Sequence, residues 1–300
     1  RLRSLLNLAP NSLLRDSATM RLGHSYLESQ DFESAASAFR QLSTSTNLLI
    51  ARESQALLGQ ALIKGGKTAD ARQVFTGLLM RMPDASRPDD FALAAVRALD
   101  ALDAGAAGNV RVVELAEAEH LLRGSVYHFN RDFDAARLHY AAVVARFPKN
   151  PTVANALYQI GRGFFLQQKY EEALNYFQRV LNEFPESTSA RDALTFSAGA
   201  YNRLKRTDQA IAAYKQYSDK YPDAPNPERP FLNIIDALHE AARHQEALQW
   251  VQQTRVRFRG GLGDALAFFA QLRIHLAQGN WQSVIADAND LSNVTDLGGT

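Results

Sequence analysis

The sequence repeats one alanine at a fixed interval of 37 residues. Ala136, Ala173, Ala210 and Ala247 follow one another at this interval, and Val284 takes the next place. Around these positions, two runs of apolar residues with helical spacing are joined by a short polar turn, which predicts a helix–turn–helix unit. Units repeated at such a length bury their apolar faces only by stacking on their neighbours. We therefore predict an all-α fold that works by holding another molecule.

The clearest unit spans residues 152–185. A first amphipathic helix is followed by a second that ends at Phe184-Pro185, because proline cannot continue a helix and disfavours helix in the residue before it. Gly161 lies in the middle of the first helix, where glycine costs roughly 1 kcal/mol relative to alanine. We expect this glycine to let the second helix approach closely at Ala173.

Other units share this small residue, the aromatics, the alanine of the second helix and, in most copies, a closing proline. Their residues are Gly23, Tyr26, Ala35 and Phe39; Gly59, Ala71, Phe75 and Pro83; Gly124, Tyr127, Ala136, Tyr140 and Pro148; and Ala198, Tyr201, Ala210, Tyr214 and Pro222. In this pattern the chain resembles the tetratricopeptide repeat family over most of its length. The resemblance implies a right-handed superhelical solenoid of stacked helix–turn–helix repeats that acts as a non-catalytic protein–protein interaction scaffold.

We predict one tetratricopeptide-like solenoid over residues 1–300. Its clear repeats are predicted at residues 16–49, 52–83, 115–148, 152–185 and 189–222, and its degenerate repeats at 228–259 and 265–291. The middle is irregular over residues 84–114, because Ala71 and Ala136 are 65 residues apart, short of two periods. There the pattern predicts a helix over 88–104, a break over 105–108 and a longer helix over 110–130.

Composition excludes several classes of function. The net charge is +1, so no overall field attracts nucleic acid or an anionic membrane. The chain has no cysteine, which rules out disulfides, thiolate metal sites and cysteine nucleophiles. No apolar run approaches the roughly 20 residues of a transmembrane helix. No phosphate loop, dinucleotide motif or metalloprotease motif occurs, so we predict no cofactor and no catalytic residue.

The loops between repeats resemble those of bacterial cell-envelope proteins of this family. They carry an aromatic residue followed by proline, as at Phe147-Pro148 and Tyr221-Pro222. The resemblance implies a periplasmic setting, with a cytoplasmic one as the alternative, and a possible envelope or cell-wall complex. Helical platforms of lytic murein transglycosylases are also similar. The alternative function is therefore such a platform, with a catalytic domain C-terminal to Thr300. We expect the chain to be a fragment of a longer protein.

In the family, the first helices line a concave groove, so their polar positions are the candidate partner-binding residues. These are Asn155, Tyr158, Arg162, Asn202, Arg203, Arg229 and His239. Amide, phenol and guanidinium groups on one face suit an extended peptide, which offers backbone amides and carboxylates. The simpler interpretation is a solvated helix face.

Two further patterns have structural explanations. His239 and His244 are five residues apart, which we expect to place them on different helix faces, and no carboxylate or thiolate completes a metal site. Arg255, Arg257 and Arg259 lie at the end of a second helix, where cations complement the helix dipole. An acidic partner is the alternative for these arginines, and pairing of terminal repeats between chains is a further possible role.

Overall fold

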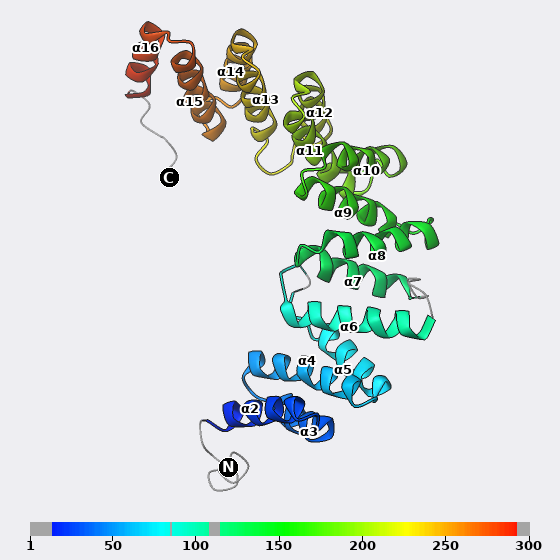
Figure 1. Ribbon diagram of the computed structural model, residues 1–300. Helices are drawn as coiled ribbons and strands as arrows, with labels where there is room; N and C mark the ends of the chain where they lie inside the picture. The colour runs from blue at the N-terminus through cyan, green and yellow to red at the C-terminus, as the bar shows by residue number, and fades with distance from the viewer. Residues whose placement is uncertain (1–13, 85, 108–114, 293–300) are drawn as a thin grey trace. The chain divides into compact units, whose positions relative to one another are not determined.

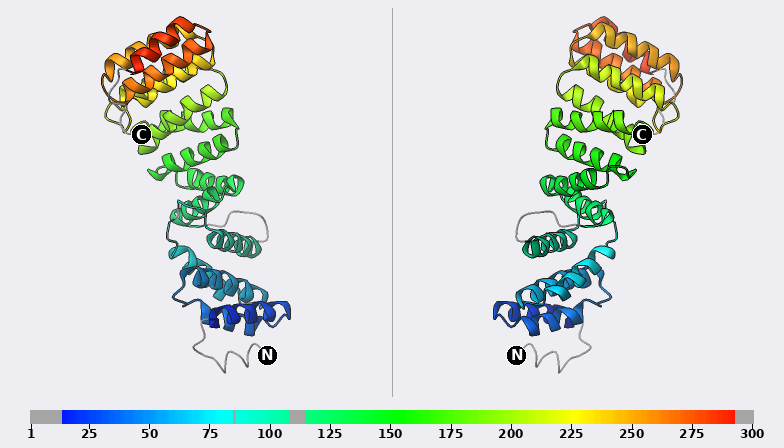
Figure 2. Two further views of the ribbon diagram at one scale, coloured as in Figure 1. Left: turned by 90° about the vertical axis from the view of Figure 1, so that its left-hand side faces the viewer. Right: turned by 90° about the vertical axis from the view of Figure 1, so that its right-hand side faces the viewer.

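The computed structural model describes residues 14–84, 86–107 and 115–292, and within them it contains helices and no strands. The chain divides into two compact units, Arg1–Pro148 and Lys149–Thr300, which we describe separately. In each unit, consecutive helices pack as antiparallel pairs stacked on their neighbours (Figures 1 and 2). This is the predicted tetratricopeptide-like helical solenoid. The prediction of one solenoid over residues 1–300 stays a prediction.

Within its described residues, unit 1 contains three helical hairpins and one single helix. The hairpins are α2 (Arg15–Glu28) with α3 (Phe32–Leu42), α4 (Leu48–Lys64) with α5 (Thr68–Met80), and α7 (Glu117–Phe129) with α8 (Phe133–Arg146). The single helix α6 (Asp90–Ala107) packs against α4 and α5 on one side and α7 on the other (Figure 1).

The described part of unit 2, residues 149–292, contains four consecutive hairpins. They are α9 (Thr152–Leu166) with α10 (Tyr170–Glu183), α11 (Thr188–Arg203) with α12 (Thr207–Lys220), α13 (Arg229–Glu240) with α14 (His244–Arg257), and α15 (Leu262–Ala277) with α16 (Trp281–Ser292). Two of the first helices also contact the next first helix: α9 contacts α11, and α13 contacts α15. The core of the last three hairpins is apolar, and it includes Leu194, Ile234, Val251 and Ile274.

The helices around the irregular segment differ from the prediction. Residues 105–107 continue α6, so the expected break does not begin at Gly105. The expected longer helix from residue 110 is also wrong, because Leu115 and Ala116 are not helical and α7 begins at Glu117. The rest of that segment, residues 108–114, lies outside the described residues.

The helix–helix turns of the seven described hairpins share one geometry. One residue in each turn has a positive φ angle: Gln30, Gly66, Arg131, Gln168, Lys205, Ala242 or Gly279. The amide of the next residue then donates a hydrogen bond to the carbonyl five residues earlier, as Lys169 does to Phe164 at 2.9 Å. This Schellman-type ending satisfies the last helix carbonyls and reverses the chain within a few residues.

The glycine of the first helix contacts a different residue from the one predicted. A Cβ on Gly161 would lie 2.7 Å from a ring carbon of Phe177 and 3.2 Å from Cβ of Tyr176, so its nearest neighbours do not include Ala173. In the same way, Gly124 lies under Tyr140. The small residue is needed because the aromatic ring of the second helix, one turn after the repeated alanine, occupies the space that a side chain would fill.

Candidate partner-binding face

Equivalent positions on the first helices of unit 2 form rows that run across the stack. The period of 37 residues places Asn155, Asp192, Arg229 and Leu266 in one row. Asn155 and Arg229 are exposed, and Asp192 is half-buried. In this row, α9, α11 and α13 present polar side chains, whereas α15 presents the apolar Leu266. We call the exposed side of α9, α11 and α13 the first-helix face.

Tyr158 is not an exposed position. Its side chain is only 8% exposed, and its ring lies 5.8 Å from that of Phe196 in α11 and 6.2 Å from that of Phe177 in α10. Burial, with a contribution from the carboxylate of Asp192, raises the pKa of Tyr158 to about 12. The expectation of an exposed phenol is therefore wrong: Tyr158 packs two repeats together, and its role in binding stays a prediction.

The other two residues predicted on α9 remain accessible. Asn155 is exposed and accepts a hydrogen bond of 3.4 Å from the side chain of Gln159. Arg162 is half-buried two turns later on the same helix face, near the ring of Tyr158. This pair can meet a partner at the α9 end of the first-helix face.

On α11 and α13 the predicted residues lie at opposite ends of the helices. Asn202 and Arg203 close α11, whereas Arg229 opens α13 and His239 comes near its end. Arg203 and Arg229 are both exposed, and neither forms an ion pair within the described residues. These two guanidinium groups are available to carboxylates of a partner.

Other cations of unit 2 are already paired between repeats. Arg206 contacts Glu171 at 2.5 Å, and Arg243 contacts Asp208 at 2.6 Å. Both pairs span 35 residues and join the start of one second helix to the start of the preceding one. These pairs form an inter-repeat ladder on the turn side, so their charges are neutralised within the chain.

His239 and His244 lie together, contrary to the prediction. His239 is near the end of α13 and His244 opens α14, so the tight turn between the helices brings their Nδ1 atoms to 3.4 Å. Burial lowers the pKa of His239, and the positive charges of Arg273 and His244 lower it further. No group of histidine and acidic residues in the described part of the chain could hold a metal ion.

The arginines at the end of α14 pack against aromatic rings. Arg255 lies 4.2 Å from the ring centroid of Phe268 and contacts Asp264 at 3.0 Å. Arg257 lies 4.9 Å from the ring centroid of Phe231. Arg255 also borders an open cleft of about 450 Å³ between α14 and α15, whose other polar lining residues are Gln252, Arg259, Asp264, Gln271 and His275. Arg255 therefore joins the last two hairpins, whereas Arg257 packs against α13 within its own hairpin.

Comparison with protein families now identifies the architecture. Three family models, each described as tetratricopeptide repeat, match residues 20–91, 114–186 and 164–229. The chain contains tetratricopeptide repeats. No curated protein sequence matches it.

Solved structures with similar folds include other tetratricopeptide repeat proteins. One from Parabacteroides merdae is 14% identical, with 93% of each chain covered and a TM-score of 0.38. The Naa15/Naa10 complex bound to HypK-THB is 14% identical, with 94% of this chain and 37% of that chain covered and a TM-score of 0.46. The apo form of RapI is 11% identical, with 93% and 86% covered and a TM-score of 0.47. At these identities and TM-scores the likenesses carry no information about partners.

Tetratricopeptide repeats make this chain a protein–protein interaction scaffold, and the architecture is typically non-catalytic. No described helix combines the length and apolar character that crossing a membrane requires. The periplasmic setting, the envelope complex and the transglycosylase platform stay predictions from the resemblance.

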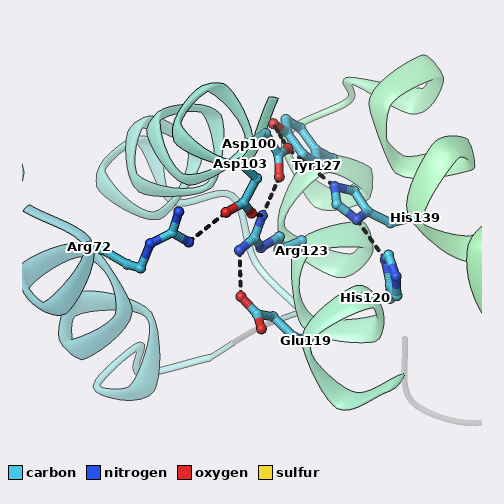
Figure 3. Close-up of polar contacts among 8 residues, drawn as sticks. All are labelled: Arg72, Asp100, Asp103, Glu119, His120, Arg123, Tyr127 and His139. Carbon is cyan, nitrogen blue, oxygen red and sulfur yellow. Dashed lines mark hydrogen bonds and ion pairs between the residues drawn. The ribbon is translucent and has the colours of Figure 1, made fainter. Parts of the chain in front are cut away.

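The tetratricopeptide repeats of unit 1 enclose a buried polar cluster that the sequence analysis missed (Figure 3). Its centre is Arg123 of α7, whose side chain is fully buried. The Arg123 guanidinium contacts Asp100 at 2.5 Å and Asp103 at 2.7 Å, both on α6, and also Glu119. Asp103 pairs in addition with Arg72 of α5 at 2.5 Å. Three helices are thus joined by an ion-pair network in which Arg123 and Asp103 are buried and the other charged groups are partly exposed.

Two histidines and a tyrosine extend this cluster toward α8. The Tyr127 hydroxyl donates a hydrogen bond of 2.6 Å to Asp100, and His139 Nε2 lies 3.2 Å from the same carboxylate oxygen. His120 Nδ1 lies 3.1 Å from His139 Nδ1. Burial alone would raise the pKa of Asp100, but hydrogen bonds from His139 and Tyr127 lower it overall.

A sequence signal for the cluster exists. Arg123 precedes Gly124, and the matching positions in the next two repeats are Ile160 and Ser197, which are both buried. A charged residue at a core position of the period requires a buried partner. Asp100 and Asp103, which lie three apart in the apolar helix before it, supply that partner.

Proposed function

We propose that this scaffold binds an acidic, extended segment of a partner protein along the first-helix face of unit 2. The observation that supports the proposal is that arginines on one side of the unit are paired with carboxylates of the chain, whereas two exposed arginines on the other side are not. On the turn side, Arg206 and Arg243 are paired in the inter-repeat ladder. On the first-helix face, Arg203 and Arg229 are exposed and form no ion pair within the described residues.

Side chains of this face match the groups of an extended peptide. Guanidinium groups bind carboxylates with two parallel hydrogen bonds, and amides such as those of Asn155 and Asn202 can bond to the peptide backbone. Rows of equivalent positions repeat from one first helix to the next, so successive residues of a partner segment would meet successive helices. Exposed charges contribute mainly to specificity and to the rate of association.

The test is to select binders to the purified chain from a random peptide library displayed on phage. We expect the selected peptides to be acidic and to lose affinity about two- to tenfold for Arg203→Glu and for Arg229→Glu, a range typical of exposed ion pairs. Lys149→Glu, in the loop before α9, makes a comparable charge change off the face and should leave the affinity unchanged.

Circular dichroism of each variant checks that the fold is intact, because the substituted side chains are exposed. Peptides that bind all three variants as well as the wild type would show that the first-helix face is not the binding surface. Weakening by Lys149→Glu to the same degree would show that the attraction reflects overall charge rather than this face.

A further inference from the structure

The cleft between α14 and α15 is bordered by polar side chains at positions that are apolar in the preceding repeat. Gln271 and His275 of α15 line the cleft, and both contact the buried Asp287 of α16. One period of 37 residues earlier, the equivalent residues are Ile234, Leu238 and Trp250. We call Gln271, His275 and Asp287 the polar trio.

The positions of the polar trio face the preceding repeat. Trp250 stands at the position of the trio's carboxylate, and Nζ of Lys215 on the preceding second helix, α12, lies 5.0 Å from its ring centroid. In unit 1, Tyr127 stands at the position of the trio's imidazole, and its hydroxyl donates a hydrogen bond to Asp100 of the preceding helix α6. By this equivalence the polar trio faces α14, and a repeat stacked after α16 would lie on the opposite side.

The cleft opens where the preceding junction is filled by an aromatic ring. Between α12 and α14, Lys215 covers the indole of Trp250. One period later, Gln252 takes the place of Lys215 and lines the cleft, and Asp287 takes the place of Trp250. A carboxylate is much smaller than an indole, which accounts for the unfilled volume of about 450 Å³ at this junction.

Asp287 holds the other two members of the trio in place. The side chain of Gln271 donates a hydrogen bond of 2.7 Å to one carboxylate oxygen, and Nδ1 of His275 lies 2.6 Å from the other. A carboxylate bound to one ring nitrogen fixes the orientation of an imidazole and leaves the second nitrogen for another group. Nε2 of His275 and Oε1 of Gln271 form no hydrogen bond within the described residues, so both atoms are available at the cleft.

The charges along the cleft indicate an anionic ligand. Asp264 accepts hydrogen bonds of 3.0 Å from Nε of Arg255 and from the amide of Gly260. Both carboxylates at the cleft, those of Asp264 and Asp287, are thus bound by donors of the chain itself. Arg259 is exposed and forms no hydrogen bond or ion pair in the part of the chain that the structure describes. Its positive charge is therefore the one left for a ligand.

We propose that this cleft binds a carboxylate group attached to an aliphatic body. The guanidinium of Arg259 pairs with the carboxylate. Gln271 and His275 bond to neighbouring polar atoms of the ligand. Leu248 and Val256, which complete the lining, contact its aliphatic part. Two sources offer this chemistry: a free aliphatic acid and the C-terminal residue of a protein chain.

The first test titrates the purified chain with N-acetyl-leucine and with acetyl-glycyl-glycyl-leucine, each as the free acid and as the C-terminal amide. Nuclear magnetic resonance of the ligand measures binding. For acids of this size we expect dissociation constants in the millimolar range. The amides should bind at least about tenfold more weakly, because they lack the charge that Arg259 pairs with. Tighter binding of the tripeptide acid identifies a chain end as the source, and equal binding of the two acids identifies a free acid.

The second test removes the unpaired charge. Arg259→Gln should weaken binding of the acids about tenfold and leave the weak binding of the amides unchanged. The matched control is Arg257→Gln at the same end of α14, because Arg257 is also exposed but lies against the ring of Phe231 and does not line the cleft. This control should bind the acids as the wild type does.

The third test separates ligand binding from packing. The triple variant Gln271→Ile, His275→Leu and Asp287→Trp installs the residues of the preceding repeat and fills the cleft. Replacing a buried polar network by well-packed apolar residues is often neutral or stabilising. We therefore expect the midpoint of urea unfolding to stay the same or rise, while binding of the acids falls more than about tenfold.

The proposal is overturned if neither acid binds saturably to the wild type, or if acids and amides bind equally well. Unchanged affinity in Arg259→Gln or in the folded triple variant would overturn it too, because the ligand would then lie elsewhere. The first-helix face is tested through Arg203 and Arg229, so either proposal can fail while the other stands.

Discussion

The two units stabilise the same kind of helical stack by different means. In unit 2 the period is regular, and the core between repeats is apolar, with small residues under aromatic rings as at Gly161 and Phe177. Ion pairs there lie at the edge, in the inter-repeat ladder. In unit 1 the period is interrupted by α6, and a fully buried Arg123 with its carboxylates joins this helix to its neighbours.

The difference shows that a regular repeat supplies apolar contacts to its neighbours, whereas an irregular helix needs other contacts. A regular hairpin contacts its neighbour through the same residue types at every interface, so the repeat itself provides the apolar contact. Helix α6 has no hairpin partner among the described residues and presents Asp100 and Asp103 toward α7 instead. Buried ion pairs require precise geometry, so they specify one position of the helix at a considerable desolvation cost.

The largest effect should come from removing the centre of the buried cluster. Arg123→Leu leaves Asp100 and Asp103 without their shared cation, and breaking a buried pair in this way costs about 3–5 kcal/mol. Urea unfolding followed by far-ultraviolet circular dichroism measures the change. Arg97→Leu on α6 is the control, because the Arg97–Asp132 pair is exposed and should contribute less than about 1 kcal/mol. Equal effects of both variants would show that burial does not distinguish these arginines.

A smaller effect should follow from filling the space under an aromatic ring in unit 2. Gly161→Ala places a Cβ 2.7 Å from Phe177, and overpacking of this kind typically costs about 1–3 kcal/mol. Gly199→Ala is the matched control on α11, where a Cβ would lie 3.6 Å from Phe165 in ordinary contact. That variant should gain up to about 1 kcal/mol of helix propensity.

Tryptophan fluorescence during unfolding measures this pair of variants. Both tryptophans, Trp250 and Trp281, belong to unit 2, so the signal reports that unit alone. If the two alanine variants shift the unfolding midpoint in the same direction, the close approach at Gly161 does not determine stability.

The most gradual effect is a dependence of the stability of unit 1 on pH. Burial, with the neighbouring His139, lowers the pKa of His120 from 6.5 to about 4. Between these values the unfolded chain binds a proton that the folded chain does not, so stability falls as the pH falls from 6.5 to 4. One group contributes at most about 1.4 kcal/mol per pH unit over this window. Above pH 6.5 it contributes no slope.

His120→Asn removes the titrating group and keeps a polar side chain. Urea unfolding at a series of pH values should show a flatter profile between pH 6.5 and 4 for this variant than for the wild type. A second loss at lower pH should remain in both proteins, because the lowered pKa of Asp100 means that its stabilisation disappears only when that carboxylate is protonated. Identical profiles above pH 4 would exclude His120 as the source.

Sequence reasoning was correct for features that recur in every repeat, and it was wrong about particular contacts between individual residues. The hairpins, their order and the need for a small residue at Gly161 follow from the period, because the same residue types recur at equivalent positions of several repeats. The partner of Gly161 was mistaken because Ala173 and Phe177 lie one turn apart on the same helix face, and spacing alone does not separate them. Tyr158 was mistaken because its exposure depends on Phe196 in the next repeat.

By itself, the sequence determined that this protein is a stack of helical hairpins and that it has no cysteine chemistry. Only the tertiary structure decided which charged side chains form ion pairs between repeats, as Arg206 does, and which remain exposed, as Arg203 does. It also revealed that Arg123, Asp100 and His139 belong to one cluster. The physical reason is that helical periodicity depends on neighbours in the chain, whereas burial and ion pairing depend on residues that packing brings together from separate helices.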